Sequence, residues 1–156
     1  MGVGEPWLGD DEQLLWRLFL RSQVLIEAQL NRQLQRDSDL SGADYAVLVN
    51  LSEAPEGRLR GFELAGALQW EKSRLSHHLT RMGRRGLVRR EGCPTDGRGA
   101  FVVLTPQGRE RIVAAAPLHV AEVRRCFIDA LTPQQRLAFG DATRALVIAL
   151  ERDGAE

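Results

Sequence analysis

The sequence predicts a mostly α-helical protein with a small β-hairpin wing, a winged helix-turn-helix flanked by long N- and C-terminal helices. Three observations predict this fold class. Apolar residues recur at three- and four-residue steps through most of the 156 residues, which is helical spacing. Two helical patterns, 62–68 and 71–85, are separated only by Gln69-Trp70, as in a helix-turn-helix. Two strand-like segments around a turn-rich stretch follow them directly.

The first long helix is predicted over residues 11–36. Its apolar residues, from Leu14 to Leu30, recur at helical steps. A helix of this length extends about 38 Å, since each residue adds roughly 1.5 Å. Because a small domain cannot bury such a length against itself, we expect part of the apolar face to pack on a second chain.

The central part of the chain alternates helical patterns with turn signals. Ser41 to Asp44 has the order of a capping box, which marks a helix start. Gly86 follows a helix at the position where a left-handed residue is favoured. The stretch from Cys93 to Gly99 is rich in turn formers and includes an Asp-Gly pair. The predicted elements are helices over 42–53, 62–68 and 71–85 and strands at 87–90 and 101–104.

Two Thr-Pro pairs predict the starts of the C-terminal helices. Threonine is a favoured cap, and proline suits the first helical position. Thr105-Pro106 therefore begins a helix that runs to about residue 128, within which Pro117 is expected to introduce a kink or a break. Thr132-Pro133 begins a last helix that runs to about residue 151.

Composition excludes several classes of protein. No stretch approaches 18 uncharged apolar residues, so no membrane span is expected. The N-terminus is acidic and lacks the basic-then-apolar order of a signal peptide, so we expect a cytoplasmic protein. The two cysteines, Cys93 and Cys126, form neither a disulfide framework nor a metal knuckle. We expect Cys126 to be a buried apolar residue.

The charge distribution favours a nucleic-acid partner, although the net charge is zero. Residues 70–98 hold eight basic and three acidic side chains, a local charge of +5. Residues 1–16 hold four acids and no base. Such local asymmetry indicates partner choice better than the net charge does. A solvated basic surface without a partner is the alternative interpretation.

The helix over 71–85 has a buried and a polar face. Leu75, Leu79 and Met82 lie at i, i+4 and i+7 and should pack against the preceding helices. An α-helix fits the DNA major groove, where arginine can bind guanine and smaller polar groups can reach base edges. The predicted DNA-binding residues of this helix are Lys72, Ser73, Arg74, Ser76, His77, Thr80, Arg81 and Arg84.

These side chains are expected to have different tasks. Arg74 is expected to bind guanine, and Ser73, Ser76 and His77 base edges or phosphates. The expected phosphate contacts, which position the protein without reading sequence, are Lys72, Arg81 and Arg84.

The hairpin is predicted to make a second DNA contact. Arg98 at its tip is expected to enter the adjacent minor groove, where narrow A·T tracts concentrate negative potential. Asp96 is expected to orient the Arg98 guanidinium. Arg89 and Arg90 alternate in direction, so at most one should face the DNA backbone. We include Arg89 in the predicted contact.

The order of motifs resembles the MarR family of bacterial regulators. The resemblance lies in 72–76, 85–90, Asp96-Gly97-Arg98 and 103–109, with Leu131-Thr132-Pro133 opening the last helix. It implies a homodimer that binds a palindromic operator, usually as a repressor. It also implies a single domain over 1–156, in which 11–36 and 106–151 form the dimerisation layer and 41–105 form the DNA-binding lobe. Many members release DNA when a small phenolic or lipophilic effector binds between these parts.

The resemblance implies an effector pocket. Trp16, Tyr45, Phe62 and Trp70 are its candidate lining residues for a small aromatic effector. The same aromatic residues also fit an ordinary core, and both interpretations stay open. No metal or cofactor is expected: His77 and His78 are adjacent and point apart, so a zinc site would need a distant partner such as Cys93 or His119.

Three alternative functions fit the sequence less well. An enzyme is disfavoured because no nucleophile–base–orienter set and no glycine-rich phosphate loop after a strand is visible. A redox-responsive regulator would use Cys93, which falls in the predicted exposed turn. The third alternative is a winged helix that binds nucleoid DNA without sequence preference or binds only protein. Such a module would not need the side chains that are predicted to contact base edges. The expected place of action is the cytoplasm, at the nucleoid.

Overall fold

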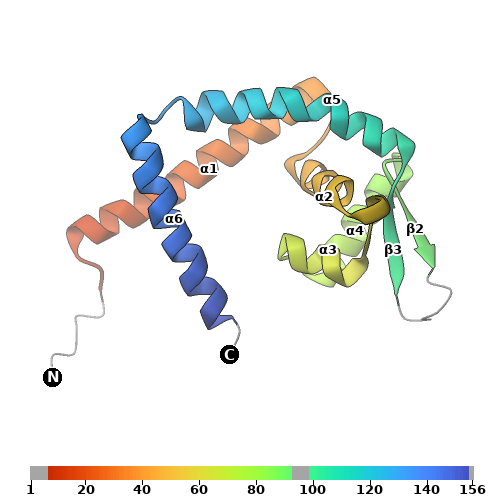
Figure 1. Cartoon of the computed structure of the whole chain (residues 1–156), viewed down its shortest axis with the longest axis horizontal. Helices are drawn as coiled ribbons and strands as arrows, with labels where there is room; N and C mark the ends of the chain where they lie inside the picture. Colours follow the sequence, from red (N-terminus) through yellow and green to blue (C-terminus); the bar gives the residue numbers. More distant parts are fainter. Residues whose placement is uncertain (1–6, 93–98, 155–156) are drawn as a thin grey trace. The chain divides into compact units, whose positions relative to one another are not determined.

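The computed structural model of the chain describes residues 7–92 and 99–154 (Figure 1). The chain divides into two compact units, Met1–His119 and Val120–Glu156. The first unit holds α1 to α4, the sheet and most of α5, and the second holds the end of α5, a π-helical segment and α6. The mostly helical fold class with a small hairpin is confirmed.

The first two helices lie close to their predicted ranges. Helix α1 spans Asp10–Ser38, and α2 spans Gly42–Glu53. The predicted capping box is present: the Asp44 N–H donates to Ser41 Oγ over 3.0 Å, and the Ser41 N–H donates to Asp44 Oδ2 over 2.9 Å.

The helix-turn-helix consists of α3 (Gly61–Leu68) and α4 (Lys72–Arg84). Gln69 adopts a left-handed conformation (φ 52°), which turns the chain between the two helices. After α4, Gly86 has φ 71°, a conformation that glycine adopts without strain. The sequence-based prediction of this helix end is confirmed.

The sheet has three antiparallel strands in the order β1-β3-β2. They are β1 (Arg58–Arg60), β2 (Val88–Gly92) and β3 (Ala100–Leu104). The hairpin β2–β3 is confirmed, and Arg90 pairs with Val102 in its register. Strand β1 was not predicted, because three residues are too few to show an alternating pattern.

The core of the first unit joins α2, α3, α4 and the sheet. Its fully buried side chains include Leu48, Leu51 and Leu64. The predicted inner face of α4 is confirmed, since Leu75, Leu79 and Met82 are at most 5% exposed. The opposite face of α4 therefore stays free to meet a partner.

The C-terminal helices lie close to their predicted ranges, but the burial of Cys126 differs from prediction. Helix α5 (Pro106–Val123) passes through Pro117 without a break and continues as a π-helix over Arg124–Ile128. Pro117 and Val113 are exposed, so water can bond the carbonyl that proline leaves without a donor. Cys126 is half-buried instead of buried, so that prediction is wrong for a single chain.

Helix α6 (Pro133–Asp153) begins at the predicted cap. The Gln135 N–H donates to Thr132 Oγ1 over 3.2 Å. None of the described side chains of α6 is buried, although several are large and apolar. The exposed ones include Leu137, Phe139, Leu146, Ile148 and Leu150.

Candidate nucleic-acid interface

The exposed face of α4 is polar and basic. Its four cationic side chains have no acidic neighbour within the helix. All the residues that the sequence assigned to DNA on this helix are exposed: Lys72, Ser73, Arg74, Ser76, His77, Thr80, Arg81 and Arg84. Thr80 Oγ1 donates to the Ser76 carbonyl over 3.0 Å, so its hydroxyl is partly engaged by the helix itself. The structure brings this predicted set together on one helix.

Arg74 rests on an aromatic ring. Its guanidinium carbon lies 4.3 Å from the centre of the Trp70 ring, a cation–π contact. Trp70 sits in the turn just before α4 and is half-buried. The in-plane N–H groups of a guanidinium held over a ring face can still donate hydrogen bonds.

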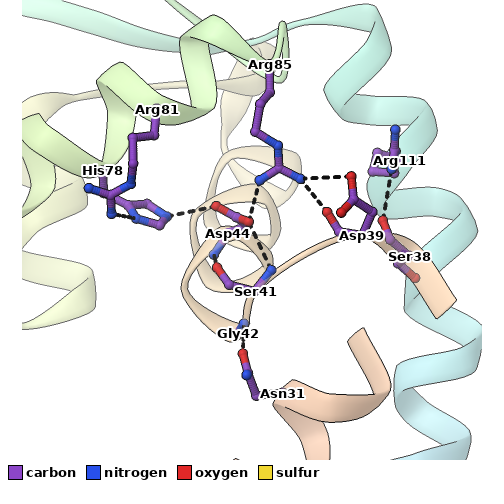
Figure 2. Close-up of polar contacts among 10 residues, drawn as sticks. All are labelled: Asn31, Ser38, Asp39, Ser41, Gly42, Asp44, His78, Arg81, Arg85 and Arg111. Atoms are coloured by element: carbon purple, nitrogen blue, oxygen red, sulfur yellow. Dashed lines mark hydrogen bonds and ion pairs between the residues drawn. The ribbon is translucent and has the colours of Figure 1, made fainter. Parts of the chain in front are cut away.

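His78 is a buried member of α4 with polar partners on two sides (Figure 2). Its Nε2 lies 3.0 Å from Asp44 Oδ1. Arg81 Nη2 lies 2.9 Å from its Nδ1, and since a guanidinium only donates, Nδ1 is the acceptor. His78 therefore ties Arg81 of the exposed face to α2.

Asp44 joins this cluster to the end of α4. Arg85 Nη1 donates to Asp44 Oδ2 over 2.7 Å, and Arg85 also donates to the Asp39 carbonyl (Figure 2). Burial by itself raises the pKa of Asp44, but the contacts with His78, Ser41 and Arg85 more than offset it and hold that pKa well below its usual range. A single carboxylate thus anchors α4 at two points. Sequence reasoning missed this role, because the partners lie far along the chain.

The hairpin presents its two arginines to opposite sides. Arg90 Nη2 donates to the Ser76 carbonyl over 3.0 Å and contacts Ser76 Oγ at 3.1 Å, so it lies against α4. Arg89 is ion-paired with Glu91. The structure thus places Arg90, and not Arg89, beside α4. Cys93, Asp96 and Arg98 lie outside the described residues.

A groove lies between α4, the start of α3 and the hairpin strands. Its volume is about 300 Å³. We call it the helix–hairpin groove; it is lined by Gly61, Phe62, Lys72, Leu75, Ser76, Leu79, Arg90, Gly99, Ala100 and Val102. Phe62, which the sequence assigned to an effector pocket, lies here instead.

A larger pocket of about 990 Å³ lies among α1, α2, the turn before α4 and α5. We call it the α1–α2 pocket, and its lining includes Glu27, Asn31, Tyr45, Trp70, Arg74 and His119. The structure brings Tyr45 and Trp70 together here. Trp16 is half exposed on α1, stacks on Phe19 at 5.8 Å and does not line the pocket.

Two rings of the α1–α2 pocket are in contact. The centres of Tyr45 and His119 are 4.2 Å apart. Burial lowers the pKa of His119, while burial and the charge of Glu53 raise the pKa of Tyr45. Both shifts favour the uncharged form of the side chain.

Neither a membrane-spanning helix nor a cluster of metal ligands occurs among the described residues. No helix among them is long and apolar enough to cross a membrane. Nowhere in residues 7–92 and 99–154 do three His, Cys, Asp or Glu side chains gather as metal ligands would.

Comparison with known proteins identifies the family to which the chain belongs. A model of the MarR family matches residues 38–99. Over 111 residues the chain is 33% identical to the transcriptional regulator HosA of Escherichia coli O111:H-, in an alignment that covers 71% of this chain and 80% of HosA. The chain belongs to the MarR family. It is a transcriptional regulator of the MarR family and not an enzyme.

Two solved MarR structures from Streptomyces coelicolor resemble the whole chain. AbsC is 46% identical, with a TM-score of 0.86 over 93% of this chain and 97% of AbsC. Sco3205, solved in complex with DNA, is 44% identical, with a TM-score of 0.86 over 92% of this chain and 94% of Sco3205. The winged-helix fold inferred from sequence is thereby confirmed.

Proposed function

We propose that this MarR-family regulator is a repressor that binds a palindromic operator sequence-specifically as a homodimer. The observation that carries this proposal is the exposed face of α4, where Lys72, Arg74, Arg81 and Arg84 stand without an acidic neighbour in the helix. Basic side chains bind phosphates, and Arg74 with His77 supplies the base-reading chemistry. The complex of Sco3205 with DNA supports the same partner here. The expected site of action is the cytoplasm, at the nucleoid.

The exposed apolar side chains of α1 and α6 support the homodimer. Leu15 and Leu18 on α1 and Leu146 and Leu150 on α6 are each more than half exposed in the single chain. Exposed apolar side chains gathered along a helix are typical of protein interfaces, and each of the two helices carries such a set. In a two-fold dimer the two α4 helices would lie about 34–36 Å apart, in successive major grooves on one face of the DNA.

The α1–α2 pocket supports release by a small aromatic effector. Tyr45, Trp70 and His119 line it with rings, and Arg74 of the recognition helix also lines it. A ligand that holds Arg74 there would withdraw it from DNA. With salicylate as the probe, we expect weaker operator binding in a gel-shift assay and no such effect in Trp70→Ala. Salicylate having equal effects on both proteins would contradict the pocket assignment.

Selection of bound fragments from the source genome tests the operator proposal. We expect recovered fragments to share a palindrome and to be bound at least about 10³-fold more tightly than scrambled DNA. Arg74→Ala and His77→Ala should change the preferred sequence more than the salt dependence, whereas Arg98→Ala should weaken binding broadly. Equal affinity for all sequences would instead indicate a nucleoid or protein-binding module. A peroxide response abolished by Cys93→Ser would indicate the redox alternative.

A further inference from the structure

The helix–hairpin groove combines an apolar wall with positive charge. Phe62 is 63% exposed at the start of α3, and Val102 and Leu79 lie in the same lining. Lys72 and Arg90 also line the groove, and none of its described lining residues is an aspartate or a glutamate. A partner that fits must therefore have an apolar part close to a negative charge.

The helix–hairpin groove lies where one DNA strand is expected to pass. In the proposed complex α4 occupies the major groove and the hairpin reaches the adjacent minor groove. The sugar–phosphate strand that separates these two DNA grooves must then cross between α4 and the hairpin. The helix–hairpin groove lies between these same elements.

We propose that the helix–hairpin groove seats one nucleotide of the strand between the two DNA grooves. Lys72 and Arg90 bind its phosphate, and Phe62 packs on its deoxyribose. This inference rests on the proposed DNA-binding function, and it adds Phe62 and Arg90 to the interface. It also gives Phe62 a reason to be exposed, since its ring is covered only when DNA is bound.

Arg90 is held in place for this contact before DNA arrives. Its Nη2 group is fixed by the carbonyl and hydroxyl oxygens of Ser76. A guanidinium has further N–H groups that can donate to a phosphate. Because the side chain is already ordered, binding costs less conformational entropy than it would for a free arginine. Arg89, ion-paired with Glu91, has no such contact with α4 among the bonds of the described residues.

The test compares Phe62→Ala, Phe62→Leu and Arg90→Gln on two duplexes, the selected operator and a scrambled duplex of the same composition. A backbone contact is independent of sequence, so Phe62→Ala should weaken both complexes by the same factor, roughly tenfold. Phe62→Leu should retain most of the affinity. Arg90→Gln should reduce the slope of log K against log salt by about 0.9, the loss of one phosphate contact.

Arg32→Gln is the matched control, an exposed arginine of α1 bonded to Gln29. It should leave both the affinity and the salt slope unchanged. Thermal unfolding of each variant should match the wild type, because Phe62 and Arg90 are exposed.

Three results would overturn the inference. If Phe62→Ala and Arg90→Gln both bind DNA with wild-type affinity and salt slope, the groove does not contact the strand. Intact operator binding by these variants would still agree with the proposed function. Loss confined to the selected operator would make Phe62 part of base reading instead. Competition by millimolar thymidine monophosphate, lost in Phe62→Ala, would make the groove a free-nucleotide site. Failure of the wild type to prefer its selected operator would instead refute the proposed function.

Discussion

At the scale of single residues, Asp44 has the widest influence on the recognition helix. It caps α2, contacts His78 in the middle of α4 and bonds Arg85 at its end. Removing one partner of such a buried charged pair usually costs about 3 kcal/mol or more. We therefore expect Asp44→Asn to lower the free energy of unfolding by about 3 kcal/mol, measured by urea denaturation.

Asp141→Asn is the control for this change. Asp141 pairs with Arg144 on the surface of α6, and both side chains are more than two thirds exposed. Exposed pairs contribute roughly 0–1 kcal/mol. If the two substitutions had equal effects, Asp44 would not be the anchor of α4.

The lowered pKa of Asp44 also predicts a response to acid. A carboxyl group whose pKa is lower in the folded than in the unfolded protein stabilises the fold above its ordinary pKa of 3.8. That contribution is lost as the pH falls from 3.8 toward the folded-state pKa. Stability of the wild type should therefore drop steeply below pH 4, and the Asp44→Asn variant should show a shallower drop. Parallel curves from pH 5 to pH 2 would contradict this.

Residue roles were partly predictable from sequence. The Ser41–Asp44 cap is local and was predicted correctly, because its partners lie three residues apart. The hydrogen bond from Arg85 to Asp44 joins residues 41 positions apart, and no local pattern encodes it. Strand alternation placed Arg89 and Arg90 on opposite sides, but which side faces α4 depends on tertiary packing.

At the scale of elements, the junction of the hairpin and α5 leaves no space at Gly108. The Gly108 N–H donates to Thr105 Oγ1 over 2.9 Å, and a Cβ atom at this glycine would lie 2.1 Å from the Leu87 carbonyl oxygen. The backbone would have to shift to admit a methyl group. We expect Gly108→Ala to destabilise the protein by roughly 2–3 kcal/mol through overpacking, measured by thermal or urea unfolding.

Gly140→Ala provides the comparison. Gly140 lies within α6, and nothing comes within 4 Å of an added Cβ. Since alanine favours a helix more than glycine does, this variant should be about 0.5–1 kcal/mol more stable. A neutral Gly108→Ala would show that the contact with Leu87 is loose.

The sequence predicted the type and range of each helix better than it predicted the effect of Pro117 or the presence of β1. The helices had strong periodicity and recognisable caps, so their ranges agree with the structure within a few residues. The continuity of α5 through Pro117 could not be predicted from sequence, because the cost of proline depends on whether water reaches the carbonyl one turn earlier. That exposure is a tertiary property, as is the pairing of β1 with β3.

At the scale of the whole molecule, the proposed dimer predicts a hydrodynamic mass twice the 17.4 kDa of one chain. Leu146→Glu would place a charge among the exposed apolar residues of α6 and should shift the equilibrium toward monomer. The melting temperature of the wild type should rise with protein concentration, since association stabilises the folded state. Sedimentation velocity measures the mass, and thermal unfolding over a dilution series measures how the melting temperature depends on protein concentration.

The Asp141→Asn variant again serves as the control, because it changes α6 without placing charge among apolar groups. It should sediment as the wild type does. A stable wild-type monomer at micromolar concentration would refute the dimer. If the wild type is a monomer, a loss of operator binding in Leu146→Glu cannot be attributed to dissociation of a dimer.

The contact between Trp70 and Arg74 makes Trp70 an intrinsic fluorescence probe of the Arg74 position. The sequence has three tryptophans, and Trp70 is the one beside the recognition helix. A cation over an indole face changes the field on its excited state. With Trp7 and Trp16 replaced by phenylalanine, emission should therefore shift when Arg74 leaves the ring. Stopped-flow mixing with operator DNA would show in real time whether that departure precedes or follows docking.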